Sequence, residues 1–145
     1  IYTLDIYGPV APNEKEWFQK LMITFPQYIL YKGCVPYNES VNTLKNYFAL
    51  LFPTRFYTEG IPGTVIDAYA AALPVIAARW ESFNDVVDEG KTGYGYKFGD
   101  KADFHRLMNE IASCPQNITK MKFQCLKKAE LFTPHETIKV LLPHL

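Results

Sequence analysis

The chain has 145 residues, of which 48% are hydrophobic and 21% are charged. This is the composition of an ordinary folded globular protein, and it excludes disordered, fibrous and collagen-like chains. Fifteen basic residues balance fifteen acidic ones, so no net charge attracts nucleic acid or an anionic membrane surface from a distance. No apolar run approaches the ~18–20 residues that a bilayer span needs. The length suits one domain with a substantial core.

Three cysteines, Cys34, Cys114 and Cys125, lie far apart and form no C-x-x-C pair. Because this spacing is typical of neither a zinc site nor a redox motif, we assign no metal and expect a reducing, cytoplasmic compartment. The chain begins within a strand-like stretch, "IYTLDIYGPV", without an initiating Met or a signal-peptide pattern. We therefore expect a fragment of a longer protein.

The first third of the chain predicts two units of a strand and a helix. Residues 2–8 mix β-branched, aromatic and aliphatic side chains and end in a Gly-Pro turn, which indicates a strand. A helix should follow, with Asn13 as its N-cap, Glu16 three residues later, and Pro26 as its stop. The pattern then predicts a strand over residues 28–33 and a short helix over residues 41–48.

The rest of the chain continues this alternation. Residues 49–53 predict a third strand that is apolar on both faces, as in a parallel sheet covered by helices on both sides. The pattern then predicts a mainly apolar helix over residues 64–73 and strands over residues 74–78 and 93–98. The last third predicts three helices: one opened by Asp100 and Asp103, one over residues 118–131, and one capped by Thr133.

Strands and helices that alternate at these lengths predict right-handed β-α-β units in an open, doubly wound α/β sheet. Such a sheet binds its ligands beyond the carboxyl ends of its strands. The segment after the third predicted strand should therefore emerge at the ligand-binding edge.

That segment, "LLFPTRFYTEGIPGTVIDAYAAALPVIAA", carries two acids, Glu59 and Asp67, in an otherwise apolar run. Gly60 and Gly63 would let the backbone approach a ligand closely and adopt positive φ, while Pro62 would stiffen the turn between them. The helix that begins near Thr64 would direct its free N–H groups and its positive dipole end at the same space. This arrangement suits a phosphate or a diphosphate.

Structural explanations exist for the same residues. Glycine and proline before a helix are common in loops without any ligand. Thr64 and Asp67 also fit a capping box, in which the acid only satisfies a backbone donor at the helix start. Glu59 is harder to explain in this way, because a carboxylate near the mouth of a covered sheet needs solvent or a hydrogen-bonding partner.

The stretch "EGIPGTVIDAYAAALPVIAARWES", followed by "DVVDEGKTGYGYKFGD", resembles the C-terminal, nucleotide-sugar-binding domain of GT-B glycosyltransferases, in particular the large retaining family four, glycosyl transferases group 1. The matching positions are Glu59, Gly60, Pro62, Asp67, Ala68, Pro74, Val75 and Ile76. The resemblance implies a Rossmann-like, doubly wound, mainly parallel sheet with flanking helices, which forms the donor-binding half of such an enzyme.

The resemblance also implies roles for individual residues. Glu59 would hold the hydroxyls of the donor sugar, and Asp67 would hold the ribose. Cys34 and Val35 would border the base. The sugar and diphosphate would meet the backbone of a loop made of Gly60, Ile61, Pro62, Gly63 and Thr64. It implies no cofactor, since the nucleotide sugar is the donor substrate.

Two residues depart from the family's pattern, and two parts of the family's domain structure are missing. Asp67 replaces the usual Glu, which shortens its reach by a methylene, and Ala72 replaces a common glycine, which we interpret as a packing change. Residues 1–145 therefore predict a partial C-terminal domain. It lacks the first strand-helix unit, whose basic residues grip the diphosphate, and the N-terminal domain that binds the acceptor.

Several other residues leave alternatives open. Tyr57 and Trp80 could line a sugar pocket or simply pack at loop ends. Arg55 and Arg79 lie near strand ends, where they could approach phosphate. Lys128 is interpreted as an ordinary solvated charge.

The sequence thus predicts the donor-binding part of a retaining glycosyltransferase that transfers a sugar to a glycan or lipid-linked acceptor, in bacterial capsule or exopolysaccharide synthesis. We expect the parent protein to be cytoplasmic, or peripheral at the inner face of the membrane, and this fragment alone to be inactive and prone to self-association. The alternative is a non-catalytic Rossmann-like module that binds a phosphorylated ligand or a protein partner.

Overall fold

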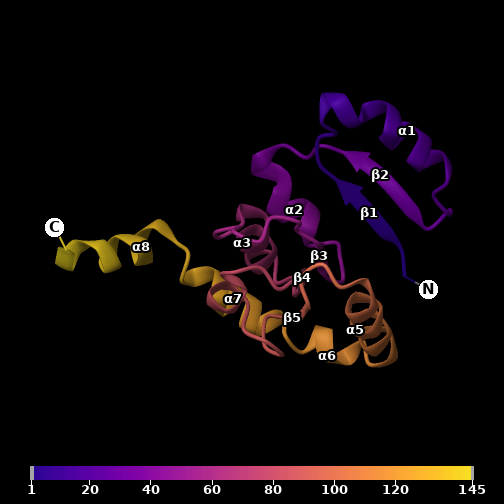
Figure 1. Ribbon diagram of the computed structural model, residues 1–145. Coiled ribbons are helices and arrows are strands. Elements are labelled where there is room, and N and C mark those ends of the chain that lie inside the picture. Colours follow the sequence, from indigo (N-terminus) through magenta and orange to yellow (C-terminus); the bar gives the residue numbers. More distant parts are fainter. Residues whose placement is uncertain (1, 145) are drawn as a thin grey trace. The chain divides into compact units, whose positions relative to one another are not determined.

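The computed structural model describes residues 2–144. The chain divides into two compact units, Ile1–Glu39 and Ser40–Leu145, and each is described by itself (Figure 1). None of the helices in the described residues is long and apolar enough to cross a membrane.

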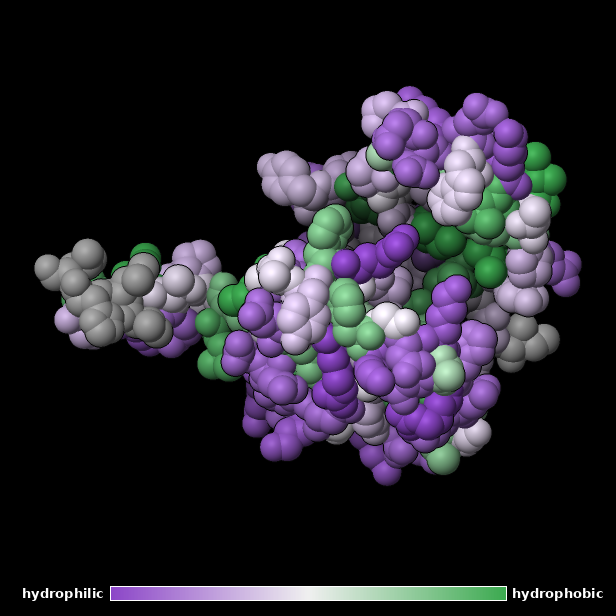
Figure 2. Space-filling model, viewed as in Figure 1, coloured by the Kyte–Doolittle hydropathy of each residue, from purple (hydrophilic) through white to green (hydrophobic). Residues whose placement is uncertain are grey.

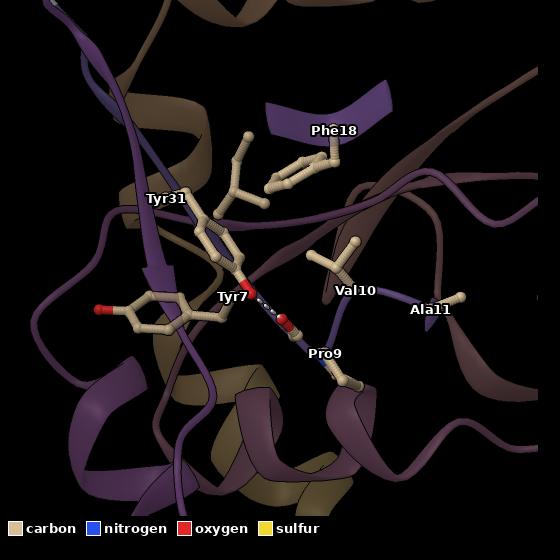
Figure 3. A pocket seen from close by; sticks show the side chains of 8 residues that line it. Tyr7, Pro9, Val10, Ala11, Phe18 and Tyr31 are labelled. Carbon is tan, nitrogen blue, oxygen red and sulfur yellow. Dashed lines mark hydrogen bonds between the residues drawn. The ribbon is translucent and has the colours of Figure 1, made fainter. Parts of the chain in front are cut away.

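The first unit is a two-stranded parallel sheet with one helix. The strands β1 (Leu4–Tyr7) and β2 (Ile29–Gly33) pair in parallel, and α1 (Lys15–Ile23) connects them. The ring of Phe18 on α1 lies edge-on to that of Tyr31 on β2, with 4.9 Å between their centroids. The Tyr31 hydroxyl donates a hydrogen bond of 2.7 Å to the Gly8 carbonyl, beside a shallow hollow in the same unit (Figure 3). A short helical turn, η2 (Tyr37–Glu39), ends the unit.

The predicted cap of the first helix is wrong. A 3-10 turn, η1 (Pro12–Glu14), precedes α1, so Asn13 lies inside that turn and not at the helix start. The N-cap is Glu14, whose side chain makes no capping hydrogen bond. Pro12 explains the shift, because its fixed φ favours the first position of a helical turn.

The second unit is a three-stranded parallel sheet with helices around it. The strand order is β3-β4-β5, with bounds Leu50–Phe52, Val75–Ala78 and Gly93–Tyr96. The helices are α2 (Ser40–Leu44), α3 (Gly63–Ala70), α4 (Phe83–Val86), α5 (Lys101–Ser113), α6 (Gln116–Thr119), α7 (Lys122–Glu130) and α8 (Pro134–Leu141), followed by η3 (Leu142–His144). Figure 2 shows a largely hydrophilic surface over α5 and α6.

The core lies in this second unit, around the central strand. All four residues of β4 are buried, whereas β3, the strand that we predicted to be covered on both faces, is only half-buried. The buried side chains around it include Val65, Tyr69, Phe83, Val86, Leu107, Ile111 and Cys125, which come from α3, α4, α5 and α7.

Two predicted helix caps in the C-terminal third are confirmed, and one predicted helix is divided. The Asp100 side chain accepts hydrogen bonds from the N–H groups of Ala102 and Asp103, and that of Thr133 accepts one from Glu136. The helix predicted over residues 118–131 is instead two helices, α6 and α7, with Lys120 and Met121 between them.

Ala72 has a special backbone conformation, so our interpretation of it as a packing change is wrong. Its φ is 57°, the only positive φ of a non-glycine residue among residues 2–144. It follows the end of α3, where the Leu73 N–H reaches back to the Ala68 carbonyl at 2.8 Å. A left-handed residue at this place is the usual way to end a helix, and glycine adopts it without steric cost.

Candidate functional site

The loop between β3 and α3 carries Glu59 and is ordered by its own hydrogen bonds. The Thr54 hydroxyl accepts from the Phe56 N–H at 3.1 Å and donates to Glu59 Oε2 at 3.4 Å. The Glu59 N–H donates to the Phe56 carbonyl at 3.3 Å. Because this loop follows the carboxyl end of a parallel strand, the half-buried Glu59 lies at the edge of the sheet where such folds bind ligands.

Two more hydrogen bonds tie the same loop to the segment after β4. The indole Nε1–H of Trp80 donates to the Gly60 carbonyl at 3.1 Å, and the Glu81 N–H donates to the Tyr57 carbonyl at 2.8 Å. The two carbonyls stand on either side of Glu59. Trp80 is 2% exposed, so of its two possible roles the structure favours packing over lining a pocket.

The glycines of the loop differ from our expectation in one respect. Neither Gly60 nor Gly63 has a positive φ, so that part of the prediction is wrong. The helix begins at Gly63 itself, with Pro62 as an extended N-cap (φ −69°, ψ 125°), and this position needs no left-handed backbone. A Cβ added at either glycine would meet no atom within 4 Å, so the space beside both is open.

The start of α3 does not contain the capping box that Thr64 and Asp67 suggested. Because Pro62 is the N-cap, Thr64 lies inside the first turn, and no side chain caps the helix. The N–H groups of Gly63 and Thr64 have no hydrogen-bond acceptor within the described residues. This helix end therefore offers backbone donors and a positive partial charge at an exposed position.

Asp67 lies one turn further along α3. It is half-buried, and its carboxylate has no hydrogen-bond or ion-pair partner within residues 2–144. Gly63 and Asp67 are four positions apart, so they lie on the same face of the helix. The opposite face, with Val65, Ala68 and Tyr69, is buried in the core. The carboxylate thus shares its face with the unpartnered helix N-terminus.

Of the two predicted residues in the first unit, Cys34 is exposed and Val35 is half-buried. Both follow β2 directly, at the carboxyl end of that strand. Cys34 is a free thiol. Ligands of such folds bind beyond the carboxyl ends of parallel strands, so this position is compatible with the predicted role in base binding.

The two arginines differ in their surroundings. Arg79 follows β4, and its guanidinium lies 2.8 Å from the Glu89 carboxylate and 4.9 Å from the centroid of the Phe83 ring. These contacts engage Arg79 within the protein. Arg55, in the loop after β3, is exposed and has no ion-pair partner in the described part of the chain.

A buried polar cluster behind α3 was missed by the sequence analysis. The Tyr69 hydroxyl lies 3.0 Å from the Val86 carbonyl and 3.2 Å from Thr92 Oγ1, and the latter accepts from the Asp88 N–H at 3.0 Å. Burial raises the pKa of Tyr69 far above its usual value, and burial raises the pKa of the neighbouring Cys125 thiol to about 12. Both groups stay protonated at neutral pH, which makes this cluster part of the scaffold.

The parallel α/β fold and the helix N-terminus behind the β3 loop define a Rossmann-like ligand-binding domain. The family described as "Glycosyl transferases group 1" matches residues 2–113 of the chain, and the chain belongs to this family. The residues that carry the resemblance, from Glu59 to Ile76, lie within the matched region.

Comparison with solved structures shows the fold. HepE of Anabaena, in complex with UDP, superposes with a TM-score of 0.76 at 15% identity, over 99% of this chain and 41% of HepE. The C-terminal domain of a group 1 family protein, LpcC of Francisella tularensis, superposes with a TM-score of 0.72 at 14% identity, over 90% of this chain and 69% of that domain. The predicted C-terminal GT-B fold is confirmed.

A curated relative matches a shorter part of the chain. The "Putative glycosyltransferase EpsD" of Bacillus subtilis (strain 168) is 27% identical over 81 residues, which are 56% of this chain and 21% of that protein. The chain thus spans about a fifth of this relative and about two fifths of HepE.

Proposed function

We propose that this chain is the donor-binding part of a retaining glycosyltransferase that transfers a sugar from a nucleoside diphosphate to a glycan or lipid-linked acceptor. The observation that carries the proposal is the start of α3. There, the N–H groups of Gly63 and Thr64 have no acceptor within the described residues, and the carboxylate of the half-buried Asp67 on the same face has no partner there either.

The chemistry of sugar transfer suits these groups. When the sugar leaves, negative charge grows on the diphosphate, and donors already aimed at that position stabilise it without reorganisation. The backbone N–H groups and the positive end of α3 supply this stabilisation. The open space beside Gly60 and Gly63 lets a phosphate approach the backbone.

Each acid then has a separate task. Glu59, at the exit of the β3 loop, holds hydroxyls of the donor sugar, and Asp67 holds the ribose of the nucleotide. The backbone of the loop at Ile61 and Pro62 meets the sugar and the diphosphate, and Cys34 and Val35 border the base. A carboxylate accepts hydrogen bonds only, which matches sugar and ribose hydroxyls as donors.

The nucleotide in this proposal is a uridine diphosphate. HepE, which shares the fold, has been solved in complex with UDP and with UDP-glucose. The segment "PTRFYTEGIPGT" supports a function in bacterial capsule or exopolysaccharide synthesis. The acceptor would bind to an N-terminal domain that residues 1–145 do not include, so we expect these residues alone to give no glycosyl transfer.

Amide variants of the two acids test the proposal in the full-length parent protein. Glu59→Gln keeps the size but removes the charge from hydrogen bonds worth about 1.5–3 kcal/mol each, so turnover of UDP-glucose should fall while UDP still binds. Asp67→Asn should weaken the binding of both UDP and UDP-glucose, because both contain the ribose. Calorimetric titration with each ligand, together with a melting curve for each variant, measures these effects.

Two results would contradict the proposal. Unchanged UDP affinity in Asp67→Asn would mean that Asp67 has a structural role and does not bind the ribose. Tight binding of UDP-glucose by the parent protein, with no transfer or hydrolysis under any condition, would favour the non-catalytic binding module.

A further inference from the structure

The strongest feature that the proposed function does not use is the attachment of the Glu59 loop to Trp80. The Trp80 indole is 2% exposed and has a single polar atom, Nε1, whose hydrogen reaches the Gly60 carbonyl at 3.1 Å. A buried indole N–H normally finds one partner, and here that partner is the residue after Glu59. The N–H of the next residue, Glu81, donates a hydrogen bond of 2.8 Å to the carbonyl of Tyr57, which lies two positions before Glu59.

The Trp80 ring is itself held on two sides. It lies edge-on to Phe52, the last residue of β3, with 5.8 Å between the ring centroids. It also lies edge-on to Phe83 on α4, at 5.5 Å. A ring fixed by two such contacts and by burial has little freedom, so its N–H is a rigid anchor for the loop.

The loop needs such an anchor. Residues 53–62 contain no helix or strand, and Phe56, Tyr57 and Ile61 are each more than half exposed. The internal hydrogen bond to Glu59 from Thr54 is long, at 3.4 Å. Without the two ties from Trp80 and Glu81, the backbone around Glu59 would lose its hydrogen bonds to the segment after β4, and the edge-on contact of the Tyr57 ring with Phe98, at 5.3 Å between centroids, would remain.

We propose that Trp80 is a positioning residue that acts through Glu59: its indole N–H holds the Gly60 carbonyl and thereby sets where the Glu59 carboxylate meets the donor sugar. This inference rests on the proposed role of Glu59. It predicts that Trp80 contributes to the recognition of the sugar and not to that of the nucleotide.

Trp80→Phe in the full-length parent protein removes the N–H and keeps an aromatic ring against Phe52 and Phe83. The matched control is Tyr69→Phe, which also removes one buried hydrogen-bond donor, from the Val86 carbonyl, but does not contact the loop. Both variants should lose thermal stability, and Trp80→Phe should lose more, because it also leaves a cavity in the core. Trp80→Phe alone should weaken UDP-glucose binding, by about tenfold, with UDP affinity within about twofold of the wild type.

A double-mutant cycle on the dissociation constant of UDP-glucose tests whether Trp80 acts through Glu59. If it does, Trp80→Phe should have little further effect once Glu59→Gln is present, because the two changes remove one shared interaction. Additive losses in the double variant would overturn the inference. So would equal effects of Trp80→Phe on UDP and on UDP-glucose.

Amide hydrogen exchange supplies a readout that does not depend on the ligand. The N–H groups of Glu59 and Glu81 are hydrogen-bonded within the tied loop, so Trp80→Phe should speed their exchange, and Tyr69→Phe should not. Unchanged exchange in Trp80→Phe would overturn the inference even if the proposed function holds. If the parent protein binds neither UDP nor UDP-glucose, the proposed donor is wrong, and exchange still decides whether Trp80 orders the loop.

Discussion

The Lys128 ammonium on α7 lies 3.1 Å from the carboxylate of Asp88, in the turn after α4. The two side chains differ in their surroundings, since that of Lys128 is 11% exposed and that of Asp88 is 44% exposed. Our interpretation of Lys128 as a solvated charge is therefore wrong. Its side chain is largely removed from water, and Asp88 is its ion-pair partner.

This asymmetry predicts that the two ends of the ion pair tolerate substitution differently. Asp88→Ala leaves the charge of a mostly buried lysine side chain without its partner and should cost about 2 kcal/mol of the free energy of unfolding. Lys128→Met fills the same space with an apolar chain and leaves an acid that water can reach, so it should cost less than about 1 kcal/mol. Urea unfolding followed by circular dichroism measures both.

A surface ion pair in the chain provides the control. On α1, the Lys20 ammonium lies 2.7 Å from the Glu16 carboxylate, and the side chains of Glu16 and Lys20 are 83% and 73% exposed. Glu16→Ala should therefore change the free energy of unfolding by less than about 0.5 kcal/mol. A loss in Asp88→Ala no larger than in Glu16→Ala would mean that the burial of Lys128 is energetically unimportant.

Ala72→Gly should stabilise the protein. Ala72 holds a φ of 57°, a region in which a Cβ is strained, and glycine removes that strain, by about 1 kcal/mol. The matched control is Ala70→Gly, at the exposed last residue of α3, where the same change relieves no strain and should lower stability. Opposite shifts of the melting temperature are expected. A lower melting temperature for both variants would contradict the strain at Ala72.

The decrease in the free energy of unfolding at acid pH should depend on Asp103. Its carboxylate accepts a hydrogen bond of 2.7 Å from the Lys97 N–H and also pairs with Arg106, and these contacts lower the pKa of Asp103 below its ordinary value of 3.8. A carboxyl whose pKa is lowered by folding stabilises the folded state above its unfolded pKa. That contribution is lost as the pH falls through the folded pKa.

Asp103→Asn should therefore be less stable than the wild type near pH 7, and the difference should shrink as the pH falls below about 4. Asp85→Asn, at an exposed acid on α4, is measured alongside as the matched change of an acid to an amide. Urea unfolding at a series of pH values checks both variants. A difference for Asp103→Asn that stays constant from pH 7 to pH 2 would contradict the role of ionisation.

Much of the fold could be predicted from the sequence because its signals are local. The apolar run of β4, the caps Asp100 and Thr133, and the strand-helix alternation each follow from a few neighbouring residues. The failures are of another kind. Asn13 lost its role as a cap because Pro12 started a separate turn, and Ala72 adopts a backbone conformation that alanine rarely shows.

The candidate site was predictable in its residues but not in its contacts. The motif places Glu59 and Asp67, yet the ties from Trp80 and Glu81 join positions about twenty residues apart, and no local pattern marks them. Glycines in β5 were equally hidden. A Cβ at Gly93 would collide with the backbone carbonyl of Val75 on the neighbouring strand, which only the register of the sheet reveals.

Gly63→Val should separate ligand binding from folding. Gly63 is the first residue of α3, its φ is not in the left-handed region, and a Cβ there meets no atom within 4 Å, so the fold should accept valine with less than about 1 kcal/mol of change. The branched side chain would occupy the space in which we place the diphosphate, and UDP affinity of the full-length parent protein should fall by at least about tenfold.

Ala70→Val makes a β-branched residue at an exposed position on the same helix, away from its N-terminus, and should leave UDP affinity unchanged. Calorimetric titration with UDP and a melting curve for each variant measure the two effects. An affinity in Gly63→Val equal to that of the wild type would show that the glycine only shapes the loop. Because the N–H groups of Gly63 and Thr64 would then meet no phosphate, the diphosphate would have to be held by other groups, of which the exposed Arg55 is the first to test.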